Sequence, residues 1–167
     1  MKKIKLTICI PTFNRFRNLD NLLNSIVKNN ITNKSVEVIV SDNASTDITG
    51  NIVKKYNKNL QLKYLKNTYN LGMAKNIINC TKYANGEFIW ILGDDDLLFN
   101  NSLREIIKLI NKNSDCDFFF FNSLNIPKNR SLKYLRSNNF LNLENFNKFS
   151  KIKFNRKDIL KDNINYH

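Results

Sequence analysis

One stretch decides the fold: Phe88-Ile89-Trp90-Ile91-Leu92-Gly93-Asp94-Asp95-Asp96, in which five large apolar residues run directly into three acids. The apolar part predicts a strand buried on both faces, as in parallel sheets. Like charges this close repel by about 1 kcal/mol in water and by several times more near a low-dielectric surface, so the cluster favours a bound cation. Oxygen ligands suit Mg²⁺ or Mn²⁺, which proteins often hold with one or two carboxylates plus substrate phosphates. The alternative is a solvated acidic turn that caps the next helix.

The composition indicates a globular protein with an anionic partner. Its 167 residues are 42% hydrophobic, and they carry a formal net charge of +13. Nucleic acid, an anionic membrane surface and phosphorylated substrates all fit that charge. No apolar run reaches the roughly 18 residues that a membrane helix needs, and the N-terminus predicts a strand rather than a signal peptide, so the expected location is the cytoplasm. The three cysteines are far apart, which favours buried, reduced thiols.

The basic residues are concentrated toward the end of the chain. After Pro127 there are ten Lys and Arg against three acids. No RNA-binding or zinc motif accompanies them, so we expect no nucleic-acid partner. We predict a domain boundary there, with one domain at 1–126 and a basic tail at 127–167 that starts an acceptor-binding or membrane-proximal region.

Strands and helices alternate along the first domain. The helix expected at 18–29 shows Leu19, Leu22, Leu23, Ile26 and Val27 on one face. A helix opened by Asn70-Leu71-Gly72 is expected to turn Met73, Ile77 and Ile78 inward. Ser102-Leu103-Arg104-Glu105 has the form of a capping box, and the helix that it starts is expected to bury the stripe Leu103, Ile106, Ile107 and Ile110. Strands are expected at 4–10, where Pro11 ends the first, and at 36–40, 60–64, 88–92 and 117–122.

This alternation predicts an α/β fold, with a mainly parallel sheet covered by helices on both faces. Ligands of such sheets bind beyond the C-terminal ends of the strands. The same edge therefore collects the turn 11–15, the segment that begins at Asp42, and the three acids. Neither a GxGxxG nor a GxxxxGK[ST] motif is present, which argues against dinucleotide and P-loop sites.

Two acids near the second strand receive different predictions. Asp42 follows the apolar strand at a place where it can accept a hydrogen bond from a base or a ribose hydroxyl. In that role Asp42→Ala weakens nucleotide binding with little loss of stability, whereas a large loss indicates a buried structural acceptor. Asp47 is expected, together with Ser45 and Thr46, to cap the following helix through side-chain oxygens.

Four motifs taken in order resemble the family 2 glycosyltransferases, which are inverting enzymes with the GT-A fold, a Rossmann-like three-layer sandwich. The motifs are Ile8 to Arg15, Val38 to Asp47, Asn70-Leu71-Gly72 with Asn76, and Leu92 to Leu98. The resemblance covers roughly residues 4–125. It is strongest to bacterial enzymes that add sugars to surface polysaccharides.

The resemblance implies a nucleotide-sugar site and a metal site. The family binds a nucleoside diphosphate sugar, usually of uridine, and its DxD motif carries Mn²⁺ or Mg²⁺. Here Gly93 replaces the first acid of the frequent family pattern, so the metal role passes to Asp95 and Asp96, and Lys75 stands where many relatives carry Arg. The implied nucleotide-sugar-binding residues are Pro11, Thr12, Asn14, Arg15, Asp42, Asn70, Gly72, Lys75, Asp94 and Asp95.

The general base that inverting transfer requires is not identified. Only Glu144, Asp158 and Asp162 remain as acids in the tail, in contexts that match no motif. Two interpretations stay open. The chain is either the donor-binding half of an enzyme that glycosylates a glycan or lipid-linked acceptor, or a nucleotide-sugar-binding module without a base. Apolar residues that alternate with lysines at 143–153 also suggest peripheral docking on an anionic membrane at its inner face.

Overall fold

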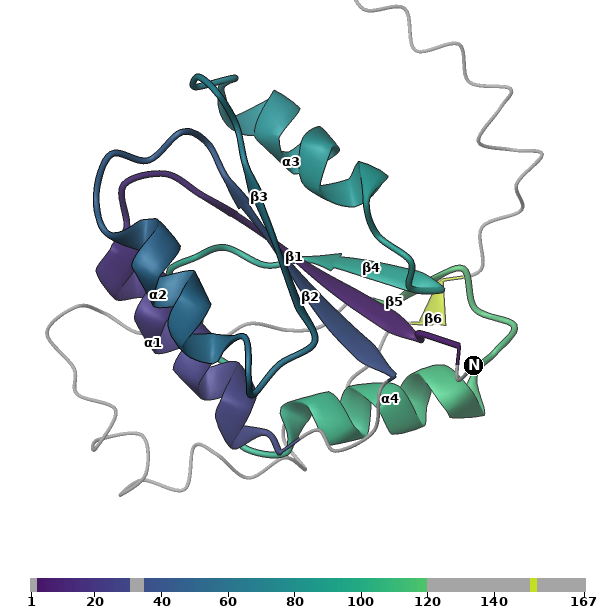
Figure 1. Cartoon of the computed structure of the whole chain (residues 1–167). Helices are drawn as coiled ribbons and strands as arrows, with labels where there is room; N and C mark the ends of the chain where they lie inside the picture. The colour runs from purple at the N-terminus through teal and green to yellow at the C-terminus, as the bar shows by residue number, and fades with distance from the viewer. Residues whose placement is uncertain (1–2, 31–34, 120–150, 153–167) are drawn as a thin grey trace, which may run out of the picture. The chain divides into compact units, whose positions relative to one another are not determined.

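The computed structural model describes residues 3–30, 35–119 and 151–152 (Figure 1). The chain divides into two compact units, 1–112 and 113–167. In the described part, no helix is long and apolar enough to cross a membrane. Pro127 lies outside the described residues, so the boundary expected there stays a prediction.

The first unit contains four strands and four helices among its described residues. In chain order they are β1 (Leu6–Thr12), α1 (Phe16–Lys28), β2 (Val36–Asp42), α2 (Thr49–Tyr56), β3 (Leu62–Lys66), α3 (Met73–Lys82), β4 (Phe88–Ile91) and α4 (Ser102–Lys112). The second unit has β5 (Phe118–Phe119), which pairs antiparallel with β6 (Lys151–Ile152). β5 falls within the strand expected at 117–122, of which residues 120–122 lie outside the description.

The four strands of the first unit form one parallel sheet in the order β3-β2-β1-β4. Figure 1 shows α3 on one face of this sheet and α4 on the other, while α1 and α2 pack side by side. The α/β class, the parallel sheet and the helices on both faces are confirmed.

The core lies between the central strands and α1. On that helix Leu19, Leu22, Leu23 and Ile26 are at most 1% exposed, which confirms the predicted apolar face. Each such side chain contributes about 1.5–3 kcal/mol when it leaves water. All three cysteines are free and buried, as expected.

Pro11 lies inside β1, so the prediction that it ends the strand was wrong. It is opposite Ser41 of β2 in the register. Cys9 accepts from Leu92 on the β4 side, whereas Thr12 accepts from Asn43 on the β2 side, so the backbone groups of Pro11 face β4. Pairing with β4 ends at Cys9, and no ladder hydrogen bond is lost where proline has no N–H.

The prediction that β4 is buried on both faces was also wrong. Ile89 and Ile91 are 47% and 49% exposed, while Phe88 and Trp90 are half-buried. The reason is the position of the helix: α3 packs mainly against β1 and β2. An apolar run of five residues does not reveal which strand a helix will cover.

The inward face of α3 differs from the one expected. Met73 and Ile78 are 77% and 54% exposed, and the buried residues are Asn76 and Cys80. Asn76 lies inward because its amide group bonds to Ser41, accepting from the hydroxyl at 2.8 Å and donating to the carbonyl at 2.9 Å. A satisfied amide at the interface thus replaces the apolar stripe.

The start of α4 is held by a residue far away in the sequence. Asn29, at the end of α1, accepts from the backbone N–H of Leu103 at 3.1 Å. The Ser102 hydroxyl donates to the carbonyl of Phe99, and Glu105 accepts from Lys108, so these two side chains make other contacts than those of the expected capping box. Of the apolar stripe predicted for this helix, Leu103, Ile106 and Ile110 are buried and Ile107 is half-buried.

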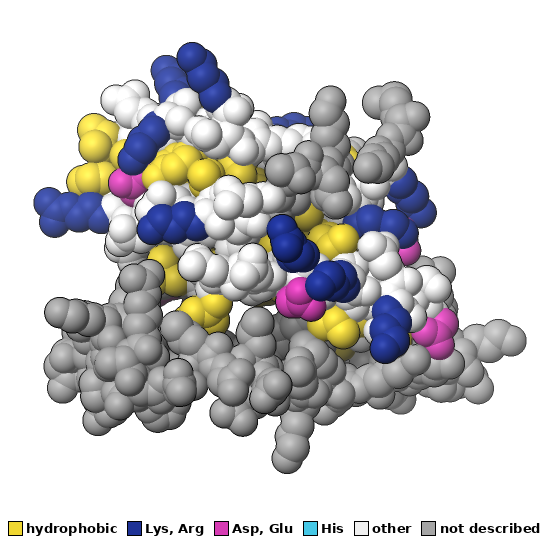
Figure 2. Space-filling view, turned by 90° about the horizontal axis from the view of Figure 1, so that it is seen from below, with side chains coloured by type: hydrophobic (Ala, Val, Ile, Leu, Met, Phe, Trp, Pro, Cys, Tyr) yellow, Lys and Arg dark blue, Asp and Glu magenta, His cyan; other side chains and the backbone are white. Residues whose placement is uncertain are grey.

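Charged side chains are spread over the surface of the described part. Figure 2 shows Lys and Arg, in dark blue, scattered over the face that it presents, with few Asp and Glu among them. The basic residues on that face lie singly or in small groups rather than in one stripe.

Candidate functional site

Loops from three neighbouring strands meet at the C-terminal edge of the sheet. The N–H of Asn43, just after β2, donates to the carbonyl of Thr12 at the end of β1. On the other side of β1, the N–H of Leu92 donates to Cys9 and places the acidic turn beside the first loop. The edge predicted from the sequence therefore exists in the structure, and it carries the polar residues described next.

The acidic residues form a closed turn after β4. The N–H of Asp96 donates to the Gly93 carbonyl at 3.1 Å, and the Gly93 N–H donates to an Asp96 carboxylate oxygen at 3.0 Å. Asp94 is 4% exposed and points inward, where its Oδ2 accepts from the Thr12 hydroxyl at 2.7 Å. Asp95 points outward, with its side chain 57% exposed. The three acids thus have three different environments.

Arg15 joins two of these carboxylates. Its Nη1 lies 3.0 Å from Asp94 Oδ1, and its Nη2 lies 2.9 Å from Asp95 Oδ2. The guanidinium therefore bridges a buried acid and an exposed one. With Thr12, four predicted site residues form one connected group.

The pKa shifts follow from this arrangement. Burial raises the pKa of Asp94 despite the Thr12 hydroxyl and the Arg15 charge, and the neighbouring acids add to the rise. The hydrogen bond from Arg15 lowers the pKa of Asp95. The bond to Asp95 also raises the pKa of Arg15. Asp95 and Arg15 consequently form an ion pair near neutral pH.

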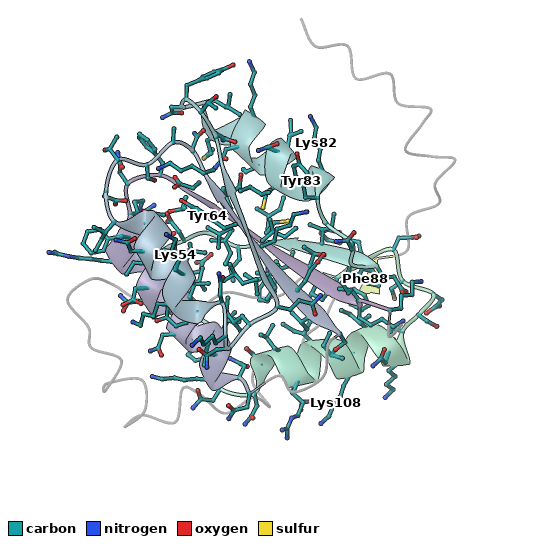
Figure 3. All side chains as sticks on the ribbon, in the orientation of Figure 1. Lys54, Tyr64, Lys82, Tyr83, Phe88 and Lys108 are labelled. Carbon is teal, nitrogen blue, oxygen red and sulfur yellow. The ribbon has the colours of Figure 1, made fainter. Side chains whose placement is uncertain are left out.

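Asp42 is fully buried, and both of its carboxylate oxygens have partners. Oδ1 accepts from the backbone N–H of Ser45 at 2.8 Å, and Oδ2 accepts from the Tyr64 hydroxyl. Tyr64 lies on the α2 side of the sheet, where a side chain at Gly50 would come within 3.3 Å of its hydroxyl (Figure 3). Burial and the contact with Asp42 raise the pKa of Tyr64. Asp42 therefore has a structural role, and its role in nucleotide binding stays a prediction.

Asn14 connects the first two loops of the edge. Its backbone has a φ of 51°, a left-handed conformation that asparagine tolerates better than most residues. The Asn14 N–H donates to the Ser45 hydroxyl at 2.8 Å, and its side-chain oxygen accepts from the Thr46 N–H at 2.8 Å. The loops after β1 and β2 are thus held together.

Asp47 accepts hydrogen bonds from the first residues of two helices. One oxygen accepts from the N–H and hydroxyl of Thr49 at the start of α2, and the other accepts from the N–H of Phe16 at the start of α1, at 3.3 Å. Burial would raise its pKa, but the bonds from Thr49 and Phe16 hold the pKa of Asp47 below its usual value. The predicted cap of α2 is confirmed for Asp47, and the second helix is an addition. The hydroxyls of Ser45 and Thr46 contact Asn14 instead.

We expect Asp47→Asn to lower the free energy of unfolding at pH 7 by about 1 kcal/mol, because the amide has a single acceptor oxygen and can cap only one of the two helices. Because the folded-state pKa is lowered, the carboxylate stabilises the fold above its unfolded pKa of about 3.9, and this contribution is lost as pH falls through the folded value. Urea unfolding at pH 7 and at about pH 3 should show the difference from wild type shrinking in acid. Glu105→Gln, at an exposed ion pair, should change stability by only a few tenths of a kcal/mol. Equal stability of Asp47→Asn and wild type at pH 7 would contradict the double cap.

Asn70 and Gly72 are held by a group of asparagines. The Asn70 side-chain oxygen accepts from Asn43 at 2.7 Å and from the Gly72 N–H at 2.8 Å. Asn67 donates to Asn43 at 3.1 Å and to Asn76 at 2.9 Å. Gly72 is the N-cap residue just before α3, with a φ of 79°, which non-glycine residues rarely adopt. The segment is thus tied by uncharged bonds to Asn43, just after β2, and through Asn43 to Asn67, just after β3.

Two residues that hold the site together, Asn67 and Tyr64, were not predicted from the sequence. Asn67 follows β3 directly, so the rule that ligands gather after parallel strands could have selected it. Tyr64, the partner of Asp42, carried no signal beyond its place in an alternating strand.

The remaining predicted residues are less connected. Lys75 is exposed on α3, and Pro11 is half-buried in β1. The candidate bases Glu144, Asp158 and Asp162 lie outside the described residues, as do most of the alternating residues that suggested membrane docking. Docking stays a prediction.

The acidic turn suits a hard divalent cation by its chemistry. In the described part, no group of three or more His, Cys, Asp or Glu is arranged to hold a metal ion. Asp95 and Asp96 are both exposed and offer only oxygen. Two carboxylates leave most of the six positions around Mg²⁺ or Mn²⁺ to water and substrate oxygens, as is usual for these ions beside phosphates. The residues fit a metal shared with a diphosphate.

Comparison with known proteins finds relatives that agree with one another. The model of Glycosyl transferase family 2 matches residues 7–166. Abequosyltransferase RfbV of Salmonella typhimurium is 38% identical over 117 residues, which cover 67% of this chain and 35% of RfbV. Poly(ribitol-phosphate) beta-N-acetylglucosaminyltransferase TarS of Staphylococcus aureus is 29% identical over 98% of this chain and 29% of its own length. The chain thus spans about a third of the length of these curated relatives.

Solved structures agree with this assignment. A structure of S. aureus TarS in complex with UDP matches with a TM-score of 0.68 and 29% identity, over 77% of this chain and 38% of that one. A mannosyltransferase from Pyrobaculum calidifontis, in complex with GDP-Man and Mn²⁺, matches with a TM-score of 0.58 and 25% identity, over 66% of this chain and 33% of that one. The chain therefore belongs to glycosyltransferase family 2, and its parallel sheet and flanking helices are those of the GT-A fold.

Proposed function

We propose that this chain binds a nucleoside diphosphate sugar, most simply one of UDP, at the C-terminal edge of its sheet. The protein of which it forms part or the whole then transfers the sugar, with inversion, to a glycan or lipid-linked acceptor in bacterial surface polysaccharide synthesis. The single observation that carries the proposal is the connected group of Thr12, Arg15, Asp94 and Asp95 at that edge. Family membership and the UDP complex of TarS support it.

Different residues would bind different parts of the nucleotide sugar. We assign the base and ribose to Thr12 and Asp42, and the sugar or ribose to Asp94. Asn70 and Gly72 would shape the diphosphate side of the pocket, with Arg15 and Lys75 as nearby cations. A guanidinium can bind phosphate oxygens with two parallel bonds, whereas Lys75 acts as a point charge.

Asp95 and Asp96 would hold Mn²⁺ or Mg²⁺ in this proposal. When bound, the metal neutralises charge that develops on the departing diphosphate. The rest of the chemistry assigned to this chain is binding and orientation, which by themselves can supply a large part of a rate enhancement. The proton of the acceptor hydroxyl requires a base that we do not assign to any described residue.

We expect binding of UDP to require a divalent metal and Asp95→Asn to weaken it about 10-fold or more, a loss typical even for partners of metal ligands. Asp47→Asn is the matched control, because it removes a charge from the same edge at a residue that bonds only to helix starts. Calorimetry with UDP, and with CDP and GDP in parallel, with and without Mn²⁺, measures both. Equal and metal-independent affinity in the two variants would contradict the metal assignment. UDP binding without any transfer or hydrolysis of a donor would favour the binding module instead.

A further inference from the structure

A positive charge already lies between the two carboxylates of the acidic turn. The Arg15 guanidinium is 3.0 Å from Asp94 and 2.9 Å from Asp95, so each of its two terminal nitrogens has its own acid. Asp94 is fixed on its other oxygen by Thr12. Arg15 therefore partly satisfies the need for a cation that the three adjacent acids create.

This ion pair has consequences for a divalent metal. A metal at Asp95 must compete with Arg15 for that carboxylate, or sit close to a second positive charge. Two positive charges held close together beside the turn repel each other. The remaining acid offers less, because one oxygen of Asp96 accepts from the Gly93 N–H. In the absence of nucleotide, Arg15 should thus weaken metal binding.

Arg15 is also placed so that it can change partners. Its side chain is 47% exposed, and it lies in the short loop between β1 and α1 rather than within either element. The bond to Asp95 joins two exposed side chains, and such an ion pair contributes little to stability because water solvates both charges. A diphosphate beside the turn would offer the guanidinium an alternative with charge-assisted bonds.

We propose that Arg15 is a positioning residue that couples metal binding to nucleotide binding. Without nucleotide it occupies Asp95 and opposes the metal. When a nucleoside diphosphate arrives, Arg15 moves to the phosphates and leaves Asp95 to the metal, so the two ligands bind together. The nucleotide part of this proposal rests on the proposed function, whereas the opposition between Arg15 and the metal does not.

The test is a titration of the full chain with Mn²⁺, in which electron paramagnetic resonance measures free Mn²⁺. We expect Arg15→Gln to bind Mn²⁺ alone about 5-fold or more tightly than wild type, and Arg15→Lys to lie between the two. Arg17→Gln is the matched control, because it removes the same charge two residues away, where Arg17 contacts the Phe16 ring at 5.5 Å. It should bind Mn²⁺ alone like wild type. Added UDP should raise the Mn²⁺ affinity of wild type by a larger factor than that of Arg15→Gln.

Different results of this titration would contradict the proposal for Arg15 or the proposed function. Mn²⁺ affinity in Arg15→Gln and Arg15→Lys that equals or falls below that of wild type, without UDP and with unchanged thermal unfolding, overturns the proposal. A gain of the same size in Arg17→Gln also overturns it, since net charge alone would then explain the effect. Failure of wild type to bind UDP at saturating Mn²⁺ contradicts the proposed function instead, and the comparison with Mn²⁺ alone is unaffected by that failure.

Discussion

Gly86→Ala is expected to lower the free energy of unfolding by about 3 kcal/mol, at the upper end of the usual cost of overpacking. A Cβ at this position would lie 2.5 Å from the backbone nitrogen of Thr7 and 2.8 Å from the carbonyl carbon of Leu6. Both atoms belong to the start of β1, which lies between β2 and β4 and cannot move without disturbing those two strands. The Gly86 N–H also donates to the Thr7 hydroxyl at 2.8 Å, so any shift of the turn strains that bond.

Gly50→Ala is the control for this substitution. Its Cβ would meet Tyr64, with the hydroxyl oxygen at 3.3 Å and the ring at 3.8 Å, a contact that a small shift relieves, and alanine is the better residue inside a helix. We expect a change within about 1 kcal/mol. Urea unfolding of both variants measures the contrast. If Gly86→Ala is no less stable than Gly50→Ala, the close approach of the turn before β4 to β1 is not as the structure has it.

The sequence analysis predicted the architecture because that part of the fold depends on local periodicity and on the topology of parallel sheets. The apolar face of α1 follows from 3.6-residue spacing alone, and the meeting of Thr12, Arg15, Asp94 and Asp95 follows from the rule that loops after parallel strands share one edge. Neither requires knowledge of side-chain packing.

The errors occurred where a contact distant in the sequence decides the outcome. Asn76 faces inward because Ser41 satisfies both ends of its amide, and Asn29 holds the start of α4 from the end of another helix. Ile89 and Ile91 are exposed because α3 packs mainly elsewhere. Hydropathy cannot show such partners, since a buried polar group costs little once it is hydrogen-bonded and is unfavourable only when it is not.

The largest expected effect within the site itself belongs to Asp42. We expect Asp42→Ala to lower the free energy of unfolding by about 3 kcal/mol, because it leaves two groups without an acceptor, the Ser45 N–H and the Tyr64 hydroxyl, at about 1–3 kcal/mol each. The sequence analysis linked the nucleotide role to a small change in stability and a structural role to a large one. Full burial of this carboxylate now favours the large change.

Tyr64→Phe separates the structural role from the binding role, because it removes one partner of Asp42 and keeps the carboxylate. We expect it to cost about 1–2 kcal/mol, while Tyr69→Phe, at a side chain that is 68% exposed, should have little effect. Thermal unfolding with and without UDP measures stability and binding in the same samples. If Asp42 orients the loop for the nucleotide, both Asp42→Ala and Tyr64→Phe should lose part of the stabilisation that UDP gives. Asp42→Ala that unfolds like wild type but no longer responds to UDP would instead show that Asp42 acts by direct contact with the nucleotide, and that its buried bonds add little to the fold.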